Sequence, residues 1–314
     1  MTGRLDIPGF RPFHAHVASR EKISESFVRI VFASPEFSRL GTDGCDQRIK
    51  ILFPLPGGRW GDPHLFDPES VAQGMWYQQW KALDNDDRNP VRTYTIRKAD
   101  PENGEMTVEF VSHSNPGPAG TFAQQCRIGD EVVIIGPDAS SRHSDLGIDF
   151  RPGPSRHLLL MGDETAVPAI SSILEHLHDS AWQGSGLALT EVPRKSDFRT
   201  LRMPSHFRMY QTATDGHKGA SLLERLKTLA ASGAAGFTPD RDQTGERIAD
   251  VEDLSDADFL WEVPPQGPDD GLYAWVAGEA SMVRSLRRFL VGNLGLDRHR
   301  IAFMGYYREG KREI

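Results

Sequence analysis

Short stretches of alternating or continuous apolar residues, separated by turns, fill the first half of the chain. Phe27–Phe32 is mainly apolar, and Arg48–Phe53 alternates before a turn rich in Pro and Gly. Further strand-like stretches cover residues 91–97, 105–113 and 130–135. Residues 59–90 show no regular period, so we expect them to be irregular. This pattern predicts an antiparallel β-barrel domain over residues 10–151.

The pattern changes after a linker rich in Pro and Gly at Arg151–Pro154. His157–Met161 is a continuous apolar run, as expected of a strand that is buried on both faces. Apolar residues then recur at helical spacing, with Pro168 in the first turn, where proline is tolerated. Later strand-like stretches cover residues 186–192, 207–212, 272–277 and 300–305. Strands that alternate with helices predict a Rossmann-like α/β domain with a parallel sheet over residues 155–314.

Two further helices carry recognisable start signals. Ser221 and Glu224 have the spacing of a capping box, in which each side chain bonds to the backbone of the other residue. Ser281 is the predicted N-cap of the last helix. Leucines at helical spacing follow both signals.

The net charge of −8 is concentrated in one segment. Residues 239–270 hold 11 acidic and 2 basic residues, whereas the rest of the chain has 33 acidic and 34 basic ones. We expect this segment to be an acidic surface insert with a short helix near residues 254–260. The nearly neutral remainder argues against a nucleic-acid-binding protein, which needs a dense basic face.

The two cysteines, Cys45 and Cys126, form no CxxC pair, so neither a disulfide framework nor a zinc site is implied. Residues 1–10 lack the apolar core of a signal peptide, and no run approaches the ~18 apolar residues that span a bilayer. We therefore expect a cytoplasmic protein without membrane insertion. Nothing in the sequence demands a multimer, so a monomer is expected.

Candidate chemistry begins with the stretch from Arg92 to Arg97, which packs two cations, a phenol and two hydroxyls into six residues. In a strand, Arg92, Tyr94 and Ile96 would share one face. A guanidinium followed on the same face by an aromatic ring suits a ligand that has both a phosphate and a planar ring. An ordinary half-exposed strand has the same pattern, so this motif alone does not distinguish a ligand site from an ordinary strand.

Later segments strengthen the ligand interpretation. Asn115–Ala123 is a turn rich in Gly and Pro that leads into a helix, whose start would offer N–H groups to an anion. Asp163–Ile170 and Trp275–Ser281 each follow or end an apolar strand and open a helix. Gly305–Gly310 follows near the C-terminal end.

In this order and spacing, these elements resemble the siderophore-interacting protein family, from about residue 12 to the C-terminus. Members of that family are FAD-dependent ferric-siderophore reductases of the ferredoxin-reductase-like superfamily. The resemblance implies a ferredoxin-NADP reductase-like fold, with an FAD-binding β-barrel followed by an NAD(P)H-binding α/β domain. It also implies an NAD(P)H-dependent flavin oxidoreductase that releases iron by reducing Fe(III) in a siderophore. Because the flavin carries the chemistry, no side chain is named as catalytic.

The resemblance assigns three sets of contact residues. For FAD these are Arg92, Tyr94, Thr95, His113, Gly117, Ala119, Gly120, Thr121, Thr165 and Tyr307. For NAD(P)H they are Asp163, Glu164, Thr165, Ala166, Arg194, Gly278, Glu279 and Ala280. For an anionic ferric siderophore they are the cations Lys50, Arg127, Arg308 and Lys311. Any one of these cations, taken singly, is better explained as ordinary surface charge.

Several features depart from the family pattern or leave the donor site undetermined. The tripeptide from Gly120 to Phe122 stands where many relatives have Ser, a variable residue and Trp, and Tyr307 stands where relatives often have Trp. A GxGxxG fingerprint is absent, so the donor site would rest on the strand-to-helix junctions. Arg194 and Lys195 could favour NADPH through its ribose phosphate, although a solvated loop pair explains them at least as well.

Alternatives stay open at this point. One is a general NAD(P)H:flavin or electron-transfer reductase without an iron partner, another is a non-catalytic ferric-siderophore carrier, and reduced ferredoxin could replace NAD(P)H. His14 and His16 share a strand face, but no accompanying ligand set predicts a metal site. Sequence motifs of serine hydrolases, P-loop NTPases and zinc proteases are absent.

Overall fold

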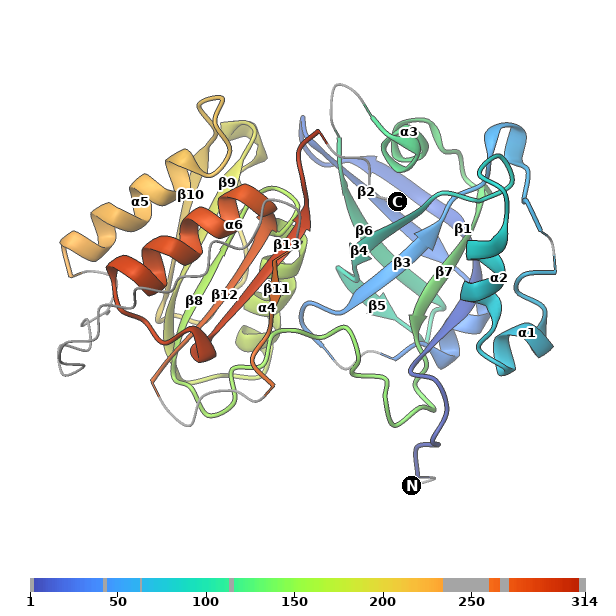
Figure 1. Ribbon diagram of the computed structural model, residues 1–314, viewed down its shortest axis with the longest axis horizontal. Coiled ribbons are helices and arrows are strands. Elements are labelled where there is room, and N and C mark those ends of the chain that lie inside the picture. The colour runs from blue at the N-terminus through green and yellow to red at the C-terminus, as the bar shows by residue number, and fades with distance from the viewer. Residues whose placement is uncertain are drawn as a thin grey trace. The chain divides into compact units, whose positions relative to one another are not determined.

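The computed structural model describes residues 3–41, 44–62, 64–112, 116–233, 260–265 and 271–310. The chain forms two compact units, Met1–Ile148 and Asp149–Ile314 (Figure 1). Most of the acidic segment, including the helix predicted near residues 254–260, lies outside the described residues.

Unit 1 is a seven-stranded antiparallel sheet, as the sequence predicts. Its strands are β1 (Phe10–Lys22), β2 (Phe27–Ala33), β3 (Arg48–Leu52), β4 (Val91–Thr95), β5 (Lys98–Asp100), β6 (Glu105–Val111) and β7 (Glu131–Pro137). The order in the sheet is β4-β3-β7-β1-β2-β6-β5, and every pairing is antiparallel. Two short 3-10 turns, Pro35–Arg39 and Pro56–Gly58, lie between strands.

The sheet curls back on itself at the motif that the sequence singled out. β4 and β5 are its two edges, yet only Ile96 and Arg97 separate them along the chain. The N–H of Ile96 donates to the carbonyl of Gln47 at 2.9 Å, and the N–H of Arg97 donates to the carbonyl of Thr107 at 2.9 Å. Since successive residues bond to opposite ends of the strand order, those ends must come together, which closes a barrel.

Strand β7 supplies both an inner and an outer apolar cluster, because successive side chains point to opposite faces. Val132 and Ile134 pack inside the barrel, whereas Val133 and Ile135 pack outside it with Leu52. Aromatic side chains from residues 60–80 cover the outer cluster.

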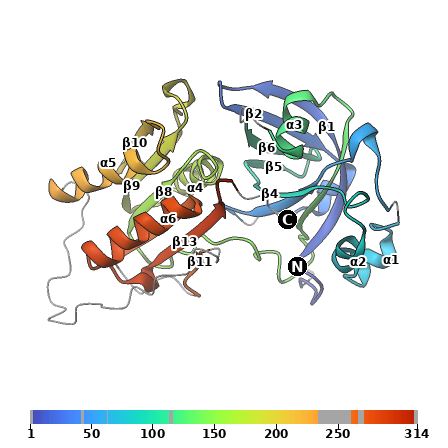
Figure 2. The ribbon, with the colours of Figure 1, turned by 45° about the horizontal axis from the view of Figure 1, so that its top comes forward.

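That covering segment contains two short helices, α1 (Pro68–Ala72) and α2 (Trp76–Ala82), which lie outside the barrel (Figure 2). The expectation of irregular structure throughout residues 59–90 is therefore wrong at these helices. Helices this short are not stable alone. Burial of Trp80 against the barrel stabilises α2, which the local sequence alone would not do. The Trp80 indole N–H also donates to the carbonyl of Asn89 at 3.0 Å.

Unit 2 is a six-stranded mixed sheet with helices on both faces (Figures 1 and 2). Its strands are β8 (His157–Gly162), β9 (Ser185–Val192), β10 (Phe207–Ala213), β11 (Trp261–Glu262), β12 (Leu272–Glu279) and β13 (Ile301–Tyr307). Its helices are α4 (Val167–Asp179), α5 (Ala220–Ala231) and α6 (Ala280–Arg287), and α3 (Pro118–Gln125) is a third helix of unit 1. A π-helical stretch, Arg288–Asn293, continues α6, and short 3-10 turns cover Lys195–Asp197 and Arg298–Arg300.

The parallel part of this sheet has the doubly wound arrangement that the sequence predicts. In β8, Leu159 and Met161 pack in one cluster with residues of α5 and α6, whereas the apolar face of α4 lies outside that cluster. Five strands run parallel in the order β10-β9-β8-β12-β13, and the short β11 adds an antiparallel edge.

The strand order reverses between β8 and β12. The chain places β9 and β10 on one side of β8, then crosses to the other side for β12 and β13. The carboxyl ends of β8 and β12 are neighbours, with Gly162 opposite Ala277. Such a switch point is where open α/β sheets bind their ligands.

The predicted helix caps need two corrections. α5 begins at Ala220, so Ser221 and Glu224 form no capping box; the Glu191 carboxylate instead accepts from the N–H groups of Gly219 at 2.7 Å and Leu222 at 3.0 Å. α6 is capped by Glu279, whose carboxylate accepts from the N–H groups of Ser281 and Met282, rather than by Ser281. Pro168 does lie in the first turn of α4, as predicted.

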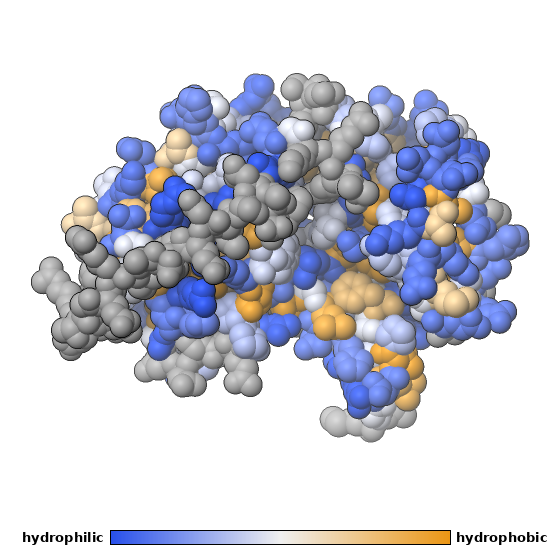
Figure 3. Space-filling model, in the orientation of Figure 1, coloured by the Kyte–Doolittle hydropathy of each residue, from blue (hydrophilic) through white to orange (hydrophobic). Residues whose placement is uncertain are grey.

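The described surface is mainly hydrophilic on the face drawn in Figure 3, with apolar residues in small groups. Among the described helices, none is long and apolar enough to cross a membrane. Cys45 and Cys126 are free thiols. Burial raises the pKa of Cys45 to about 12 and that of Cys126 to about 11, so both stay protonated at neutral pH.

Candidate functional site

The first group of predicted site residues lies at the barrel closure. The Tyr94 ring packs against Phe110, with 4.4 Å between ring centroids, and Ile96 also packs against the inner cluster. Arg92 is half-buried, and its guanidinium donates to the carbonyl of Val91 at 2.7 Å. Thr95, the last residue of β4, is buried.

The Gly- and Pro-rich turn leads into α3, which begins at Pro118 with Gly117 as its N-cap. Among the described residues, no side chain caps this helix start. The N–H of Thr121 donates to the carbonyl of Gly117 at 2.8 Å, which is the first bond of the helix. The N–H groups of Ala119 and Gly120 belong to the first turn, where an α-helix provides no backbone acceptor, so they are suited to an anion.

An aromatic cluster brings the turn and the β4 motif together. The Phe53 ring lies 5.1 Å from that of Phe122 in α3 and 6.4 Å from that of Tyr94 in β4, measured between centroids. Phe53 therefore links the Tyr94 ring of β4, two residues beyond Arg92, to helix α3. The Arg92 guanidinium, the Tyr94 ring and the first-turn N–H groups of α3 are the donors and the apolar surface that a flavin with a pyrophosphate requires, so the residues present fit FAD.

Gly120 has a steric reason to differ from the serine of many relatives. A Cβ atom at this position would lie only 2.8 Å from the Cβ of Pro116. The turn as built here therefore favours glycine over serine at this position.

The described members of the predicted substrate set lie on separate elements. Lys50 is exposed on β3, where its ammonium lies 3.4 Å from the Thr93 hydroxyl. Arg127 is exposed just after α3, and Arg308 is half-buried just after β13 in the other unit. His113 and Lys311 lie outside the described residues.

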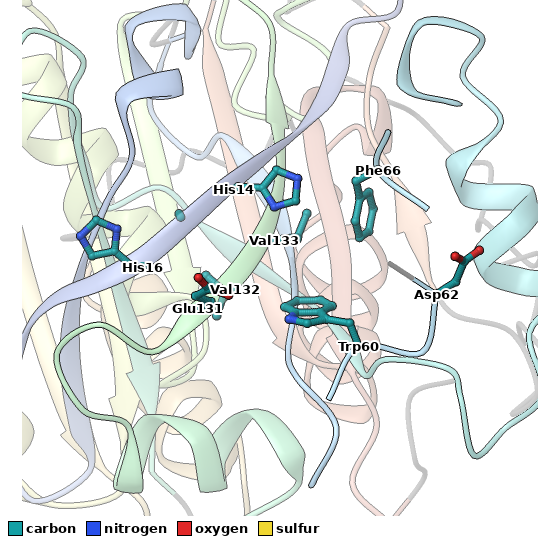
Figure 4. Close-up of a pocket in the computed structure, with 9 residues that line it drawn as sticks. His14, His16, Trp60, Asp62, Phe66, Glu131, Val132 and Val133 are labelled. Carbon is teal, nitrogen blue, oxygen red and sulfur yellow. The ribbon is translucent and has the colours of Figure 1, made fainter. Parts of the chain in front are cut away.

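Two cavities in unit 1 lie on the outer face of the barrel. One, of about 300 Å³, is lined by His14, His16, Trp60, Asp62, Phe66 and Glu131 together with β1 and β7 residues (Figure 4). The other, of about 680 Å³, shares His14 and Phe66 with the first. None of the predicted site residues that the structure describes lines either cavity. No group of three or more His, Cys, Asp or Glu side chains in the described ranges is placed to hold a metal ion.

In unit 2, the carboxyl end of the sheet is organised by the buried carboxylate of Asp163. It accepts hydrogen bonds from the N–H of Thr165 at 2.9 Å, the Thr165 hydroxyl at 2.6 Å and the N–H of Glu279 at 2.7 Å. The carboxylate thereby joins the two predicted strand-to-helix junctions. Gly278 permits the contact, because a Cβ there would lie 2.6 Å from the Asp163 carboxyl carbon.

Burial and the neighbouring Glu164 carboxylate raise the pKa of Asp163 to about 7. Burial also opposes ionisation of Glu279, but hydrogen bonds from Ser281 and Met282 outweigh it and lower the Glu279 pKa. The site therefore has one carboxyl that titrates near neutral pH beside one that stays ionised.

Lys218 contacts Glu164 and Tyr307 at the same edge of the sheet. Its ammonium lies 2.6 Å from a carboxylate oxygen of Glu164 and also makes a short hydrogen-bond contact with the Tyr307 hydroxyl. Burial disfavours the Lys218 charge, yet Glu164 outweighs burial and raises the Lys218 pKa. Burial and the two carboxylates raise the pKa of Tyr307, so its hydroxyl keeps its proton.

Comparisons with known proteins cover both units. Residues 16–141 match the siderophore-interacting FAD-binding domain, and residues 155–310 match the siderophore-interacting protein family. The chain belongs to the siderophore-interacting protein family.

Individual relatives are similar over nearly the whole chain. Ferric vibriobactin reductase ViuB of Vibrio cholerae is 23% identical over 295 residues, which are 94% of this chain and 88% of ViuB. The siderophore-interacting protein SipS from Aeromonas hydrophila has a TM-score of 0.64 at 25% identity, over 97% of this chain and 94% of SipS. A ferredoxin NADP+ reductase from Neisseria gonorrhoeae, solved with bound FAD and NADP, has a TM-score of 0.58 at 12% identity, over 95% of this chain and 99% of that one.

These matches confirm the family resemblance, the ferredoxin-reductase-like fold and FAD as the cofactor. Relatives named as ferric reductases confirm the expected enzyme class, a flavin oxidoreductase. The individual contact residues of this siderophore-interacting protein stay predictions.

Sequence reasoning missed Lys218 and Glu191. Lys218 follows β10, so the rule that ligands bind beyond the carboxyl ends of parallel strands could have marked it. Glu191 stands in an apolar strand, and its capping of α5 depends on contacts that are distant in sequence. Arg194, which was predicted, is exposed just after β9, next to the exposed Lys195.

Replacing Asp163 with Asn tests whether the pKa of the Asp163 carboxyl is raised in the folded protein. A carboxyl whose pKa is higher in the folded state than its ordinary value of 3.8 stabilises the fold most at low pH, and that stabilisation is lost as pH rises from about 4 to about 7. Asn cannot titrate and loses one hydrogen bond. We expect Asp163→Asn to be less stable than the wild type at pH 5, with the gap narrowing by on the order of 2 kcal/mol at pH 8.

Urea unfolding at both pH values measures this gap. A gap that stays constant, or that widens at pH 8, would show that Asp163 does not hold a proton in the folded protein near neutral pH.

Proposed function

We propose that this protein is a ferric-siderophore reductase that takes electrons from NAD(P)H through FAD and releases Fe(II) from the siderophore. The observation that carries the proposal is the contact of the Phe53 ring with both Tyr94 in the β4 motif and Phe122 in α3. That arrangement provides the ring surface and anion donors of a flavin site in a chain whose first unit matches an FAD-binding domain.

In unit 1, the residues 92–95 and 117–121 would hold FAD. The Arg92 guanidinium and the first-turn N–H groups of α3 would bind the pyrophosphate, and Tyr94 would pack against the flat part of the cofactor. His113 belongs to the same proposed set. When bound, FAD accepts a hydride from a two-electron donor and gives up electrons one at a time.

In unit 2, the junctions at residues 162–166 and 277–281 would bind NAD(P)H beyond the carboxyl ends of β8 and β12. Gly278 has a φ of +140°, a backbone conformation that favours glycine at this junction. Thr165, Ala166 and Ala280 flank the same edge. Arg194 lies at the end of the next strand, where a cation suits the ribose phosphate of NADPH.

The substrate would be an anionic ferric siderophore. Lys50, Arg127 and Arg308, with Lys311, are the cations proposed to attract it. Oxygen-rich chelators bind Fe(II) less tightly than Fe(III), so reduction releases the metal. One NAD(P)H gives NAD(P)+, a proton and two electrons, which reduce two Fe(III) chelates. The protein would act as a monomer in the cytoplasm, where NAD(P)H is available, and reduced ferredoxin is the alternative donor.

Anaerobic turnover tests this function. FAD-loaded protein is mixed with NADH, NADPH or reduced ferredoxin and with ferric hydroxamate, catecholate or citrate complexes, and Fe(II) is trapped by a chromogenic chelator. The proposal expects Fe(II) release from at least one siderophore class faster than from an equal amount of free FAD. Release equal to that of free FAD would point to a general flavin reductase, and bound FAD that no donor bleaches would point to a carrier.

Arg92→Ala tests the flavin site directly. Loss of a charge-assisted contact to the pyrophosphate should weaken FAD binding by at least about tenfold, measured by flavin fluorescence quenching. Lys98→Ala is the matched control, because it removes an exposed cation from the neighbouring strand β5. Equal FAD affinity in both variants would remove Arg92 from the site.

A further inference from the structure

The carboxyl edge of the unit 2 sheet is rich in acid. Asp163 and Glu164 directly follow β8, and Glu279 ends β12; their side chains are almost completely buried. The backbone N–H of Glu309 donates to the Glu279 carboxylate at 3.3 Å. Glu309 is exposed and brings a further carboxylate to this edge. The donor assigned to this edge is itself an anion, since its pyrophosphate carries negative charge. The edge therefore needs cationic compensation before such a donor can bind.

Lys218 is placed to supply that compensation. Its ammonium pairs with Glu164 at 2.6 Å, and only 23% of its side chain and 5% of the Glu164 side chain are exposed. A pair this far removed from water is screened much less than a surface pair. The same nitrogen contacts the Tyr307 hydroxyl and lies 4.8 Å from the centroid of the Tyr307 ring.

The backbone around Lys218 is fixed independently of this ion pair. The next residue, Gly219, donates its N–H to the Glu191 carboxylate at 2.7 Å, and Leu222 adds a second N–H at 3.0 Å. This cap anchors the start of α5 to the end of β9. Lys218 follows the edge strand β10, yet it reaches the ends of β8 and β13, which lie two and four places along the sheet. Its side chain thus bridges the edge at which the donor is proposed to bind.

We propose that Lys218 is a positioning residue that sets the affinity for NAD(P)H, by neutralising Glu164 and holding the hydroxyl of Tyr307. It acts through these two residues and not by touching the nicotinamide or the flavin. This inference rests on the proposed donor site and names the residue that regulates it.

Substitutions of both members of the pair separate this role from a direct contact. Lys218→Met leaves Glu164 uncompensated, so the dissociation constant for NADP+ and the KM for NADPH should rise about tenfold, with kcat within about twofold. Glu164→Gln removes the charge that needs compensation. The double variant should therefore bind NADP+ within about threefold of Glu164→Gln alone. Lys218→Arg should keep most of the wild-type affinity, because it keeps the charge.

Two readouts are used on the FAD-loaded protein. Calorimetric titration with NADP+ gives affinity without turnover, and NADPH-dependent ferricyanide reduction gives KM and kcat without a siderophore. If the wild-type protein reduces ferricyanide but no ferric siderophore, the proposed substrate is wrong. The role of Lys218 in NADP+ binding can still be tested with the same variants. Lys227→Met, an exposed lysine on α5, is the control for the loss of one positive charge.

Several results would overturn the inference. One is unchanged NADP+ affinity in Lys218→Met, and another is a fall in kcat with KM unchanged. A third is a double variant much weaker than Glu164→Gln, which would show that Lys218 binds the donor directly. If Lys218→Met fails to fold, the comparison of Glu164→Gln with the double variant still tests the inference. Both of these variants lack the Glu164 carboxylate, so neither leaves it buried without its cation.

Discussion

The buried carboxylate of Asp163 is the contact on which the second unit depends. It comes from the end of β8 and accepts the N–H of Glu279 from the end of β12, so two segments more than a hundred residues apart are fixed to each other. Two bonds from Thr165 hold the carboxylate itself in place. Glu279, once fixed, caps α6, and Glu191 does the same for α5. Acidic side chains at strand ends thus set where the helices begin, at the edge where a parallel sheet binds ligands.

The first unit depends on a comparable constraint at its barrel closure. Two residues, Ile96 and Arg97, connect the opposite edges of the sheet, so the motif before them cannot move without opening the barrel. This rigidity suits Arg92 and Tyr94 to orient a cofactor whose own chemistry is demanding. The start of α3 is held to the same place by aromatic packing through Phe53. In both units, the proposed ligand contacts therefore stand where the chain topology restricts the backbone most.

Sequence reasoning predicted the parts of this structure that follow from local pattern. The strand at His157–Met161 and the helix start at Pro168 could both be predicted from apolar periodicity and from proline geometry. The helix caps could not, because Glu191 and Glu279 act on α5 and α6 from strand ends, and a local rule favoured the serines at 221 and 281. Helix α2 was missed because packing of Trp80 on the barrel, not local propensity, stabilises it. Lys218 was missed because its partners are distant in sequence and meet only at the sheet edge.

The central claim is that the two strand-to-helix junctions of unit 2 form one donor site joined through Asp163. Hydrogen exchange of the FAD-loaded protein, with and without saturating NADP+, tests it most directly when followed by mass spectrometry. The account predicts that peptides covering residues 158–170 and 274–285 gain protection together. Protection gained by only one of them, or by neither, would contradict it.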